Sequence, residues 1–395
     1  MNEALVEKQD SHILITLSGH IDSANAESIR NEIFAQIGDE KGSSLTVEAE
    51  NLEYISSAGL RILLQLRKSH PDMHIVDVSP EVYDIFDVTG FTQMMDISRA
   101  YKTVSVEDAE VIGRGANGTI YRIDKDNVVK VYNDPDSLDD IQHEREVARL
   151  ALILGIPTAI SYDIVRVGNS YGSVFELLNA RSFSKILATE PDKMDWCVTE
   201  YVELLKKIHD TQVPHGKLPD MKKTVIHWAE FMKDYLPAET AGKLMELIEA
   251  VPQNDHMIHG DYHTKNVELT GDEVLLIDMD TIAVGDPVFE FASIYNAFIG
   301  FSELDHHIIE EFQGFSFETA LLFWNKVLVE YFGTDDKDVL SDLENKARVI
   351  GYTRLIRRSI RRKGLEDEKR RAEIEHWTAE LIDLVDKVDS LSYSI

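Results

Sequence analysis

The segment His259–Asn266 constrains this chain more than any other part of its sequence. Asp261 stands five positions before Asn266, and Asp278 follows twelve residues after the asparagine, at the end of a short apolar run. Phosphoryl transfer needs an aspartate to orient an attacking hydroxyl, and an asparagine and a second aspartate to hold Mg²⁺ on a nucleotide. The spacing therefore predicts that Asp261 acts as the base, that Asn266 and Asp278 hold the metal, and that ATP and Mg²⁺ are cofactors.

The composition limits the classes of protein to consider. A chain of 395 residues exceeds what one hydrophobic core usually supports, so two or three domains are expected. The formal net charge of −31 repels nucleic-acid phosphates and anionic membranes, so neither is expected as a partner. The single cysteine, Cys197, excludes an internal disulfide and predicts a small buried side chain. Without a leader-like start or a long apolar run, we expect a soluble, cytoplasmic protein.

Residues 1–100 show alternating strand and helix patterns, which predict a small α/β domain. Strands are expected at residues 12–19, 44–49 and 73–78, and helices at 24–37, at 58–67 and from Pro80 onward. Ser23 is a candidate cap for the first helix. Pro80 suits the first turn of the third helix, where its missing N–H costs nothing. The polar stretch 98–108 then predicts a linker to a second domain at 108–395.

Three motifs in this first domain resemble the STAS family, the anti-anti-sigma factors of bacteria. They are Gly19–Asp22, Asn51–Leu60 and Ser79–Gly90, in the order and spacing of that family. The resemblance covers nearly the whole domain, and it implies a surface that binds an anti-sigma factor or a similar protein.

The same resemblance implies a phosphorylation site at Ser57, because this family carries a modified Ser or Thr at the start of a helix. A phosphate there adds roughly −1.5 to −2 charge beside unpaired backbone N–H groups. The family commonly has Asp before the modified residue, whereas this chain has Ser56. The alternative is that Ser56 or Ser57 only caps the helix.

A glycine-rich hairpin is expected at the start of the second domain. Gly113, Gly115 and Gly118 separate two strand patterns, and a third strand carrying Lys130 follows. A dinucleotide-binding glycine loop opens into a helix, whereas this one opens into strands, the arrangement that covers ATP phosphates. The spacing therefore favours a kinase-type nucleotide site containing the three glycines and Lys130.

The helix expected after Lys130 contains two candidate partners for its ammonium group, Glu144 and Glu146. They lie about 200° apart around a helix, so only one faces the cleft, and we prefer Glu146. The next apolar strand ends near Glu176 and Leu178, where a hinge would offer backbone groups to adenine. Residues 108–178 are therefore interpreted as an N-lobe and 179–395 as a mainly helical C-lobe.

The second domain resembles the aminoglycoside phosphotransferase and choline kinase superfamily, which has a protein kinase-like fold. The residues that carry this resemblance are His259–Asn266, Ile277–Thr281, Gly285–Pro287 and Phe289–Ala292. It implies a bilobal α+β phosphotransferase domain after the α/β domain. The chain departs from protein kinases in having Gly260 where Arg is usual and Met279-Asp280 in place of Phe-Gly.

Two further patterns have simpler explanations than function. His259 and His263 flank Asp261, but we expect His259 to support the loop rather than bind zinc. Asp286 is expected to stabilise its loop by bonding to backbone. Arginines at 354–362 form a basic helix face, which we interpret as a solvated face with ion pairs to acidic residues at 366–368 and 373–375.

Three functions fit these patterns. The leading hypothesis is an ATP- and Mg²⁺-dependent transfer of phosphate to a hydroxyl of a small molecule, such as an alcohol or amino alcohol, with the STAS-like domain regulating it or binding a partner. The second is a protein kinase for a STAS serine, either Ser57 or one on another protein. The third is a non-catalytic module gated by nucleotide, which the intact set of Lys130, Asp261, Asn266 and Asp278 disfavours.

Overall fold

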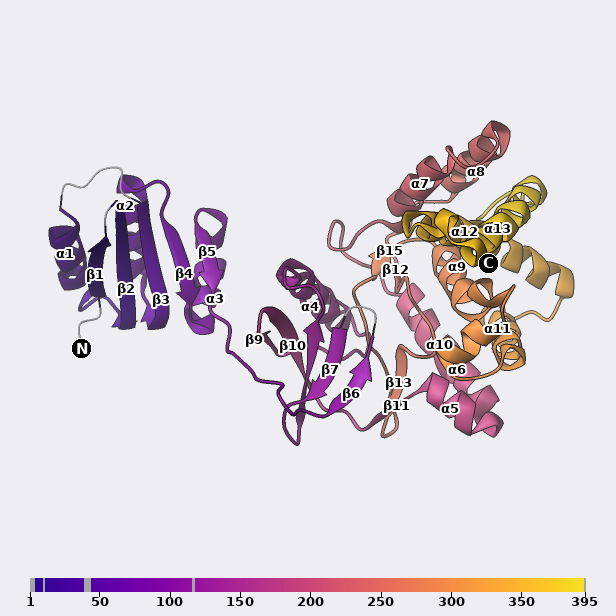
Figure 1. Cartoon of the computed structure of the whole chain (residues 1–395), viewed down its shortest axis with the longest axis horizontal. Helices are drawn as coiled ribbons and strands as arrows, with labels where there is room; N and C mark the ends of the chain where they lie inside the picture. Colours follow the sequence, from indigo (N-terminus) through magenta and orange to yellow (C-terminus); the bar gives the residue numbers. More distant parts are fainter. Residues whose placement is uncertain (1–3, 10, 39–43, 116–117, 394–395) are drawn as a thin grey trace. The chain divides into compact units, whose positions relative to one another are not determined.

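The structure is a computed structural model and describes residues 4–9, 11–38, 44–115 and 118–393. The chain divides into two compact units. Figure 1 labels the helices and strands that make them up. The first comprises residues 1–121, 131–135 and 163–173, and the second comprises residues 122–130, 136–162 and 174–395.

The first sheet has five strands in the order β1-β2-β3-β4-β5. Their bounds are β1 Ala4–Gln9, β2 His12–Ile21, β3 Ser44–Ile55, β4 His74–Val78 and β5 Asp96–Arg99. β1 pairs antiparallel with β2, and the other neighbours are parallel. In β2 the buried residues Ile13, Ile15 and Leu17 alternate with more exposed ones, which is the period-two pattern expected of a strand.

Three helices pack with this sheet: α1 (Ala26–Ile37), α2 (Ser57–Ser69) and α3 (Pro80–Val88). Ile29, Ile33 and Ile37 of α1 are buried, so their helical spacing is confirmed. Pro80 is confirmed in the first turn of α3. The capping role expected for Ser23 is wrong, because Asn25 is the N-cap residue and the Asp22 side chain accepts from the N–H groups of residues 24 and 25.

Two edges of the domain differ from expectation. β1 was not expected at all, and β5 includes Ser98 and Arg99, which were expected to lie in a linker. The N–H of Ala100 also donates to the carbonyl of Val78, which continues the β4–β5 pairing. Beyond it, the backbone of Arg166 donates to Lys102 and accepts from Val104, so part of the polar stretch is ordered by strand-type pairing.

A second five-stranded sheet has the order β6-β7-β8-β10-β9. Its strands are β6 Val111–Arg114, β7 Gly118–Arg122, β8 Asn127–Tyr132, β9 Asp163–Val167 and β10 Ser170–Glu176, with helix α4 (Leu138–Ile153) inserted after β8. β6 and β7 form the expected antiparallel hairpin. Gly118 is required there, because a Cβ at this position would collide with the backbone carbonyl of Val131.

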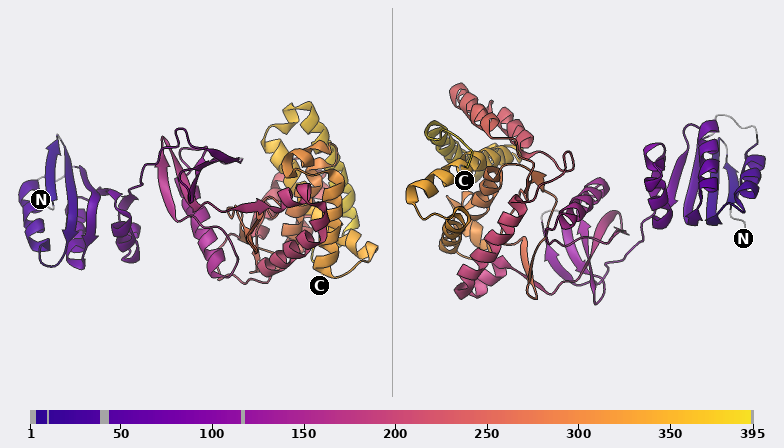
Figure 2. Two further views of the ribbon diagram at one scale, coloured as in Figure 1. Left: turned by 90° about the horizontal axis from the view of Figure 1, so that it is seen from below. Right: turned by 180° about the vertical axis from the view of Figure 1, so that it is seen from behind.

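The rest of the chain is mostly helical (Figure 2). The helices are α5 Phe183–Thr189, α6 Met194–His209, α7 Met221–Met232, α8 Ala238–Ala250, α9 Pro287–Phe298, α10 His307–Gln313, α11 Phe317–Phe332, α12 Lys337–Arg361 and α13 Glu368–Lys387. Every residue of α9 after its first is buried, and α12 packs against both α9 and α13. This apolar core fixes the elements that carry the site.

Two small sheets hold the segment around Asp261. β12 (Met257–Ile258) pairs with β15 (Ala283–Val284), and β13 (Val267–Thr270) lies between β11 (Ala180–Ser182) and β14 (Glu273–Leu276). β13 and β14 form the expected hairpin, with Thr270 opposite Glu273. The chain therefore leaves β12, passes through a loop containing Asp261, and returns in β13.

Candidate active site

Lys130, Glu144 and Asp278 come together from three separate elements. Lys130 Nζ lies 3.1 Å from Glu144 Oε1 and 3.2 Å from Asp278 Oδ1. The side chains of Lys130 and Glu144 are only 16% and 14% exposed, whereas that of Asp278 is 40% exposed. The ammonium group is thus held by one mostly buried carboxylate and lies beside a second carboxylate that solvent or a ligand can reach.

The preference for Glu146 as the partner of Lys130 is wrong. Glu144 makes the contact, and Glu146 is exposed on the other side of α4. The buried face of α4 includes Ile141, Val147 and Ala148, and Glu144 lies three or four residues from each of them. That apolar spacing, applied to the sequence, would have selected Glu144.

Removing the Glu144 carboxylate is expected to release Lys130 from its position. For Glu144→Ala we expect kcat/KM to fall about 10²-fold, the typical effect of misplacing a group that positions substrate. Glu146→Ala is the matched control, since it removes the same charge from the exposed face of the same helix. Steady-state kinetics with ATP varied would measure both, and equal losses in the two variants would contradict the assignment.

Asp261 lies in the loop between β12 and β13, with 40% of its side chain exposed. Its Oδ2 is 3.5 Å from His263 Nε2. Burial alone would raise the pKa of this carboxyl, but the hydrogen bond and charge of His263 and the charge of Arg354 together lower it to about 2. Asp261 is therefore ionised at neutral pH and available to accept a hydrogen bond from a hydroxyl.

Asn266 connects Asp261 to the segment that carries Asp278. Its side-chain Nδ2 donates to the backbone carbonyl of Asp261 at 3.0 Å, and its own carbonyl accepts from the N–H of Ile277 at 3.0 Å. Asp278 follows at once in the left-handed backbone region, with φ of 64°. These bonds bring together the three residues that the sequence spacing singled out.

The electrostatics around Asp278 suit a divalent cation. Burial, followed by the negative charges of Asp278 and Glu144, raises the pKa of Asp280 to about 7. No three His, Cys, Asp or Glu side chains of the described residues lie close enough to hold a metal by themselves. Mg²⁺ is commonly held by one or two protein oxygens plus the phosphates of a nucleotide, and Asp278 with the amide oxygen of Asn266 fits that donor set.

Glu290 is the main residue that the sequence reasoning missed. It lies on α9, is fully buried, and accepts hydrogen bonds from the backbone N–H groups of His259 and Gly260, the latter at 2.9 Å. A buried carboxylate is tolerated when its oxygens are bonded in this way. The available signal was an acidic residue inside an otherwise apolar helix, Phe289–Ala292.

Further bonds fix the same loop. Gly260 has φ of 80°, and a Cβ there would lie 2.6 Å from the carbonyl oxygen of Thr281, which explains the glycine at this position. The carbonyl of Gly260 accepts from Ser293 Oγ at 2.9 Å and from Arg354 Nη1 at 3.0 Å. Arg354, on α12, was considered only as part of a solvated basic face, so its role in the loop is a second omission.

The two histidines that flank Asp261 act locally. His259 is fully buried, and its Nδ1 accepts from the N–H of Asp261 at 3.3 Å. Burial lowers the pKa of this imidazole, which keeps it neutral.

Asp286 caps α9 by accepting from the N–H of Val288 at 3.0 Å, as expected of a residue bonded to backbone.

The remaining nucleotide-site residues lie where the sequence placed them, without a contact that tests their role. Gly113 and Arg114 are the last two residues of β6, and Gly115 follows directly. Residues 116–117 lie outside the described residues. The N–H of Gly115 donates to the carbonyl of Gly118 at 2.9 Å. Glu176 ends β10, and Leu178 lies between β10 and β11, so their hinge role stays a prediction.

In the first domain, the two serines at the start of α2 occupy different positions: Ser56 caps the helix and Ser57 is its first residue. Ser56 is the N-cap residue, and its Oγ accepts from the N–H groups of Ala58 and Gly59 at 3.3 and 3.5 Å. Ser57 is the first residue of the helix and is exposed. Because Ser56 performs the capping, the hydroxyl of Ser57 is not needed for that role.

Comparison with known proteins gives the reaction class and then the family of this chain. A kinase-like fold of this kind is typical of phosphotransferases. Residues 108–321, more than half of the chain, match the model of the phosphotransferase enzyme family, and residues 3–106 match that of the STAS domain. The chain belongs to the phosphotransferase enzyme family and carries an N-terminal STAS domain.

The STAS domain has curated bacterial relatives. It is 31% identical over 99 residues to the putative anti-sigma factor antagonist BtrV of Bordetella bronchiseptica, covering 24% of this chain and 84% of that protein. It is 24% identical over 89 residues to the anti-sigma F factor antagonist of Paenibacillus polymyxa, covering 22% of this chain and 76% of that one. Both matches, of 99 and 89 residues, are close in length to the STAS match at residues 3–106.

Solved structures similar to this chain include the ADP-bound aminoglycoside phosphotransferase APH(2'')-Ib, with 15% identity and a TM-score of 0.49 over 70% of this chain and 94% of that one. The gentamicin complex of APH(2'')-IIa gives 15% identity and a TM-score of 0.47 over 70% of this chain and 93% of that one.

No helix in the described part of the chain is long and apolar enough to cross a membrane. Cys197 is buried and unpaired, as expected.

Proposed function

We propose that the protein transfers the γ-phosphate of ATP, with Mg²⁺, to a hydroxyl of a small molecule. The observation that carries this proposal is the contact of Lys130 Nζ with Glu144 at 3.1 Å and Asp278 at 3.2 Å. In kinases a lysine fixed in this way contacts the nucleotide phosphates, and the neighbouring aspartate holds the metal. The match to the phosphotransferase enzyme family supports the same reaction class.

Each residue then has a defined task. Lys130, fixed by Glu144, binds the nucleotide phosphates, and Asp261 orients the acceptor hydroxyl and takes its proton as the new bond forms. Asn266 and Asp278 would hold Mg²⁺, which neutralises phosphate charge when bound. Glu290 contributes indirectly, because it accepts a hydrogen bond from the backbone of Gly260, which directly precedes Asp261. The hairpin glycines and the backbone near Glu176 and Leu178 would enclose the nucleotide.

Release of ADP tests this proposal. With a pool of small alcohols, turnover is expected to require both ATP and Mg²⁺ and to stop when EDTA removes the metal. A coupled assay for ADP would measure it in the full chain. Tight nucleotide binding without turnover on any acceptor or on the protein itself would instead favour the non-catalytic module.

The STAS domain is proposed to bind a partner protein and to regulate or tether the phosphotransferase domain. Its similarity to anti-sigma factor antagonists supports a partner of the anti-sigma type. A cytoplasmic location agrees with such a partner and with the unpaired Cys197. The net charge of −31 supports the absence of nucleic-acid binding.

A second candidate function follows from the exposure of Ser57 at the N-terminus of α2. In this proposal the phosphotransferase domain acts as a serine protein kinase on Ser57 or on the equivalent serine of a partner. A phosphate at that position would be stabilised by the helix dipole and would change the charge of the surface. Mapping of phosphorylation by peptide mass distinguishes this candidate from the first.

The two serines are expected to respond differently to substitution. Ser56→Ala should lower the stability of the STAS domain by about 1 kcal/mol, since it removes the cap of α2. Ser57→Ala should change stability by less than about 0.5 kcal/mol, as an exposed substitution. Chemical denaturation of the full chain would compare the two variants, with unfolding monitored by a probe placed in the first domain. A larger loss in Ser57→Ala would contradict the division of roles.

A further inference from the structure

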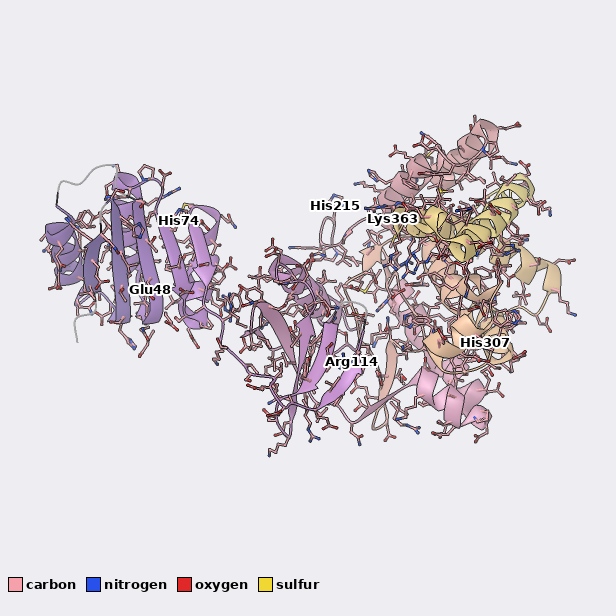
Figure 3. The ribbon with its side chains drawn as sticks, viewed as in Figure 1. Glu48, His74, Arg114, His215, His307 and Lys363 are labelled. Atoms are coloured by element: carbon pink, nitrogen blue, oxygen red, sulfur yellow. The ribbon has the colours of Figure 1, made fainter. Side chains whose placement is uncertain are left out.

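The C-terminal end of α12 carries a concentrated positive charge in an acidic protein. Four side chains, which we call the arginine cluster, line a hollow of about 290 Å³: Arg357, Arg358, Arg361 and Arg362. Figure 3 shows nitrogen-tipped side chains gathered beside the labelled Lys363, which follows the cluster in the chain. Residues 108–321 match the phosphotransferase family model, so α12 and its cluster lie beyond the matched stretch.

The expected ion pairs do not neutralise this cluster. Within the described parts of the chain, no Asp or Glu forms a salt bridge with any of the four arginines. Asp367 instead caps α13, and Lys369 pairs with Asp305. The interpretation of a face neutralised by acidic residues at 366–368 and 373–375 is therefore wrong for these four arginines, and Asp367 caps α13 instead.

Aromatic rings hold two of the guanidinium groups in place. Arg357 lies over Trp228 and Phe231, at 6.0 and 5.9 Å from the ring centroids, and Arg358 lies 5.0 Å from that of Phe301. Stacking of this kind orients a guanidinium group without neutralising it. Arg357 and Arg358 are thus oriented before any ligand arrives, which lowers the entropic cost of binding one.

The arginines also repel one another. Burial and the neighbouring charge of Arg361 lower the pKa of Arg357, and burial with the charges of Arg362 and Arg354 lowers that of Arg358. A lowered pKa means that the charged form is less stable here than in water. An anion bound in the hollow would relieve this repulsion, and bidentate Arg contacts suit phosphate and carboxylate oxygens.

The cluster is close to the proposed catalytic base. Arg354, one turn earlier on α12, donates to the carbonyl of Gly260, which directly precedes Asp261. The charge of Asp261 acts on Arg358 as well. From Arg354 to Arg361 the helix rises about 10 Å. Arg354 and Arg358 thus connect the helix that carries the hollow to the loop that carries Asp261.

We propose that the arginine cluster binds an anionic group, a phosphate or a carboxylate, carried by the acceptor alcohol. This inference rests on the proposed function and narrows its acceptor from alcohols in general to anionic alcohols. A cationic acceptor, such as the amino alcohol considered from the sequence, would be repelled by four unneutralised arginines. The positive hollow selects by charge, while Asp261 acts on the hydroxyl at the other end of the molecule.

Binding of inorganic phosphate tests the cluster directly. The full chain, saturated with ADP and Mg²⁺ to occupy the nucleotide site, would be titrated with phosphate by calorimetry. Arg358→Ala/Arg362→Ala is expected to weaken binding roughly tenfold or more, since each arginine supplies charge-assisted bonds. Arg358→Lys/Arg362→Lys keeps the charge and should recover only part of the affinity. Arg61→Ala/Arg149→Ala, which removes two exposed arginines elsewhere, should bind like the wild type.

A transfer assay then tests the acceptor class. Glycerol 3-phosphate and glycerate carry an anionic group on the same alcohol skeleton as glycerol, and serinol carries an amine. A higher kcat/KM for either anionic compound, lost in Arg358→Ala/Arg362→Ala, supports the inference and identifies the preferred anion.

Equal phosphate affinity in all four proteins, or equal rates with glycerol and its anionic forms, would overturn the inference. So would tight binding of a phosphoserine peptide together with no preference among the small acceptors. Phosphate binding that depends on the arginines, combined with no turnover on any alcohol, would instead count against the proposed function and leave the anion site standing.

Discussion

Asp261→Ala is expected to lower kcat about 10²–10⁴-fold, the range for loss of a positioned general base. The carboxylate is ionised, partly exposed and held by His263 and by its own backbone bonds. Nucleotide affinity should stay close to that of the wild type, because Lys130 and Asp278, which are proposed to hold the phosphates and metal, are untouched. Calorimetry with a non-hydrolysable ATP analogue and a steady-state ADP assay measure the two effects separately.

Asp272→Ala is the matched control for this substitution. Asp272 lies exposed in the turn between β13 and β14, so its loss removes the same charge a short distance along the chain without touching the loop. An unchanged kcat in the Asp261→Ala protein would contradict the assignment of Asp261 as the base. A loss of nucleotide binding equal to the loss in rate would assign it to the nucleotide site instead.

Glu290→Ala should be the most destabilising single substitution around the site. It leaves the buried N–H groups of His259 and Gly260 without their acceptor. Each buried donor left unsatisfied costs about 1–3 kcal/mol, so the total loss is expected to be roughly 2–6 kcal/mol. Thermal denaturation would show it as a lower Tm for the transition of the second unit, in which Glu290 lies.

Two further variants separate this effect from a simple loss of charge. Glu290→Gln keeps one acceptor oxygen and should lose about half as much stability. Glu310→Ala removes an exposed carboxylate that pairs with His307 on the surface, and it should cost less than about 1 kcal/mol. Similar Tm values for Glu290→Ala and Glu310→Ala would contradict the role of Glu290 in holding the loop.

Local patterns predicted most of the fold. The alternation in β2 and the spacing of the isoleucines in α1 are confirmed, because each depends only on which face of one element is buried. β1 was missed because Glu7, Lys8 and Gln9 give a polar edge strand, stabilised by pairing with β2 rather than by its own pattern. β5 was missed for a similar reason, since it is short and partly polar.

The site was less predictable where it depends on tertiary contacts. Asp261, Asn266 and Asp278 are close in sequence, so their order was readable. In the structure Asn266 is hydrogen-bonded to the backbone of Asp261 and of Ile277, which directly precedes Asp278. Glu290 on α9 and Arg354 on α12 both bind the backbone of Gly260. A local sequence pattern does not predict which backbone groups a distant side chain will bind. The choice of Glu146 failed because helix phase was not compared with the apolar face of α4.

The most direct test of the central claim follows labelled phosphate from ATP. The full chain and its Asp261→Ala variant would be incubated with γ-labelled ATP, Mg²⁺ and the small alcohols, and the label would be located in small molecules and in protein peptides. The account predicts label in a small alcohol with the wild type and none with the variant. Label found only on Ser57 in the wild type, and absent in the variant, would contradict it and identify a serine protein kinase.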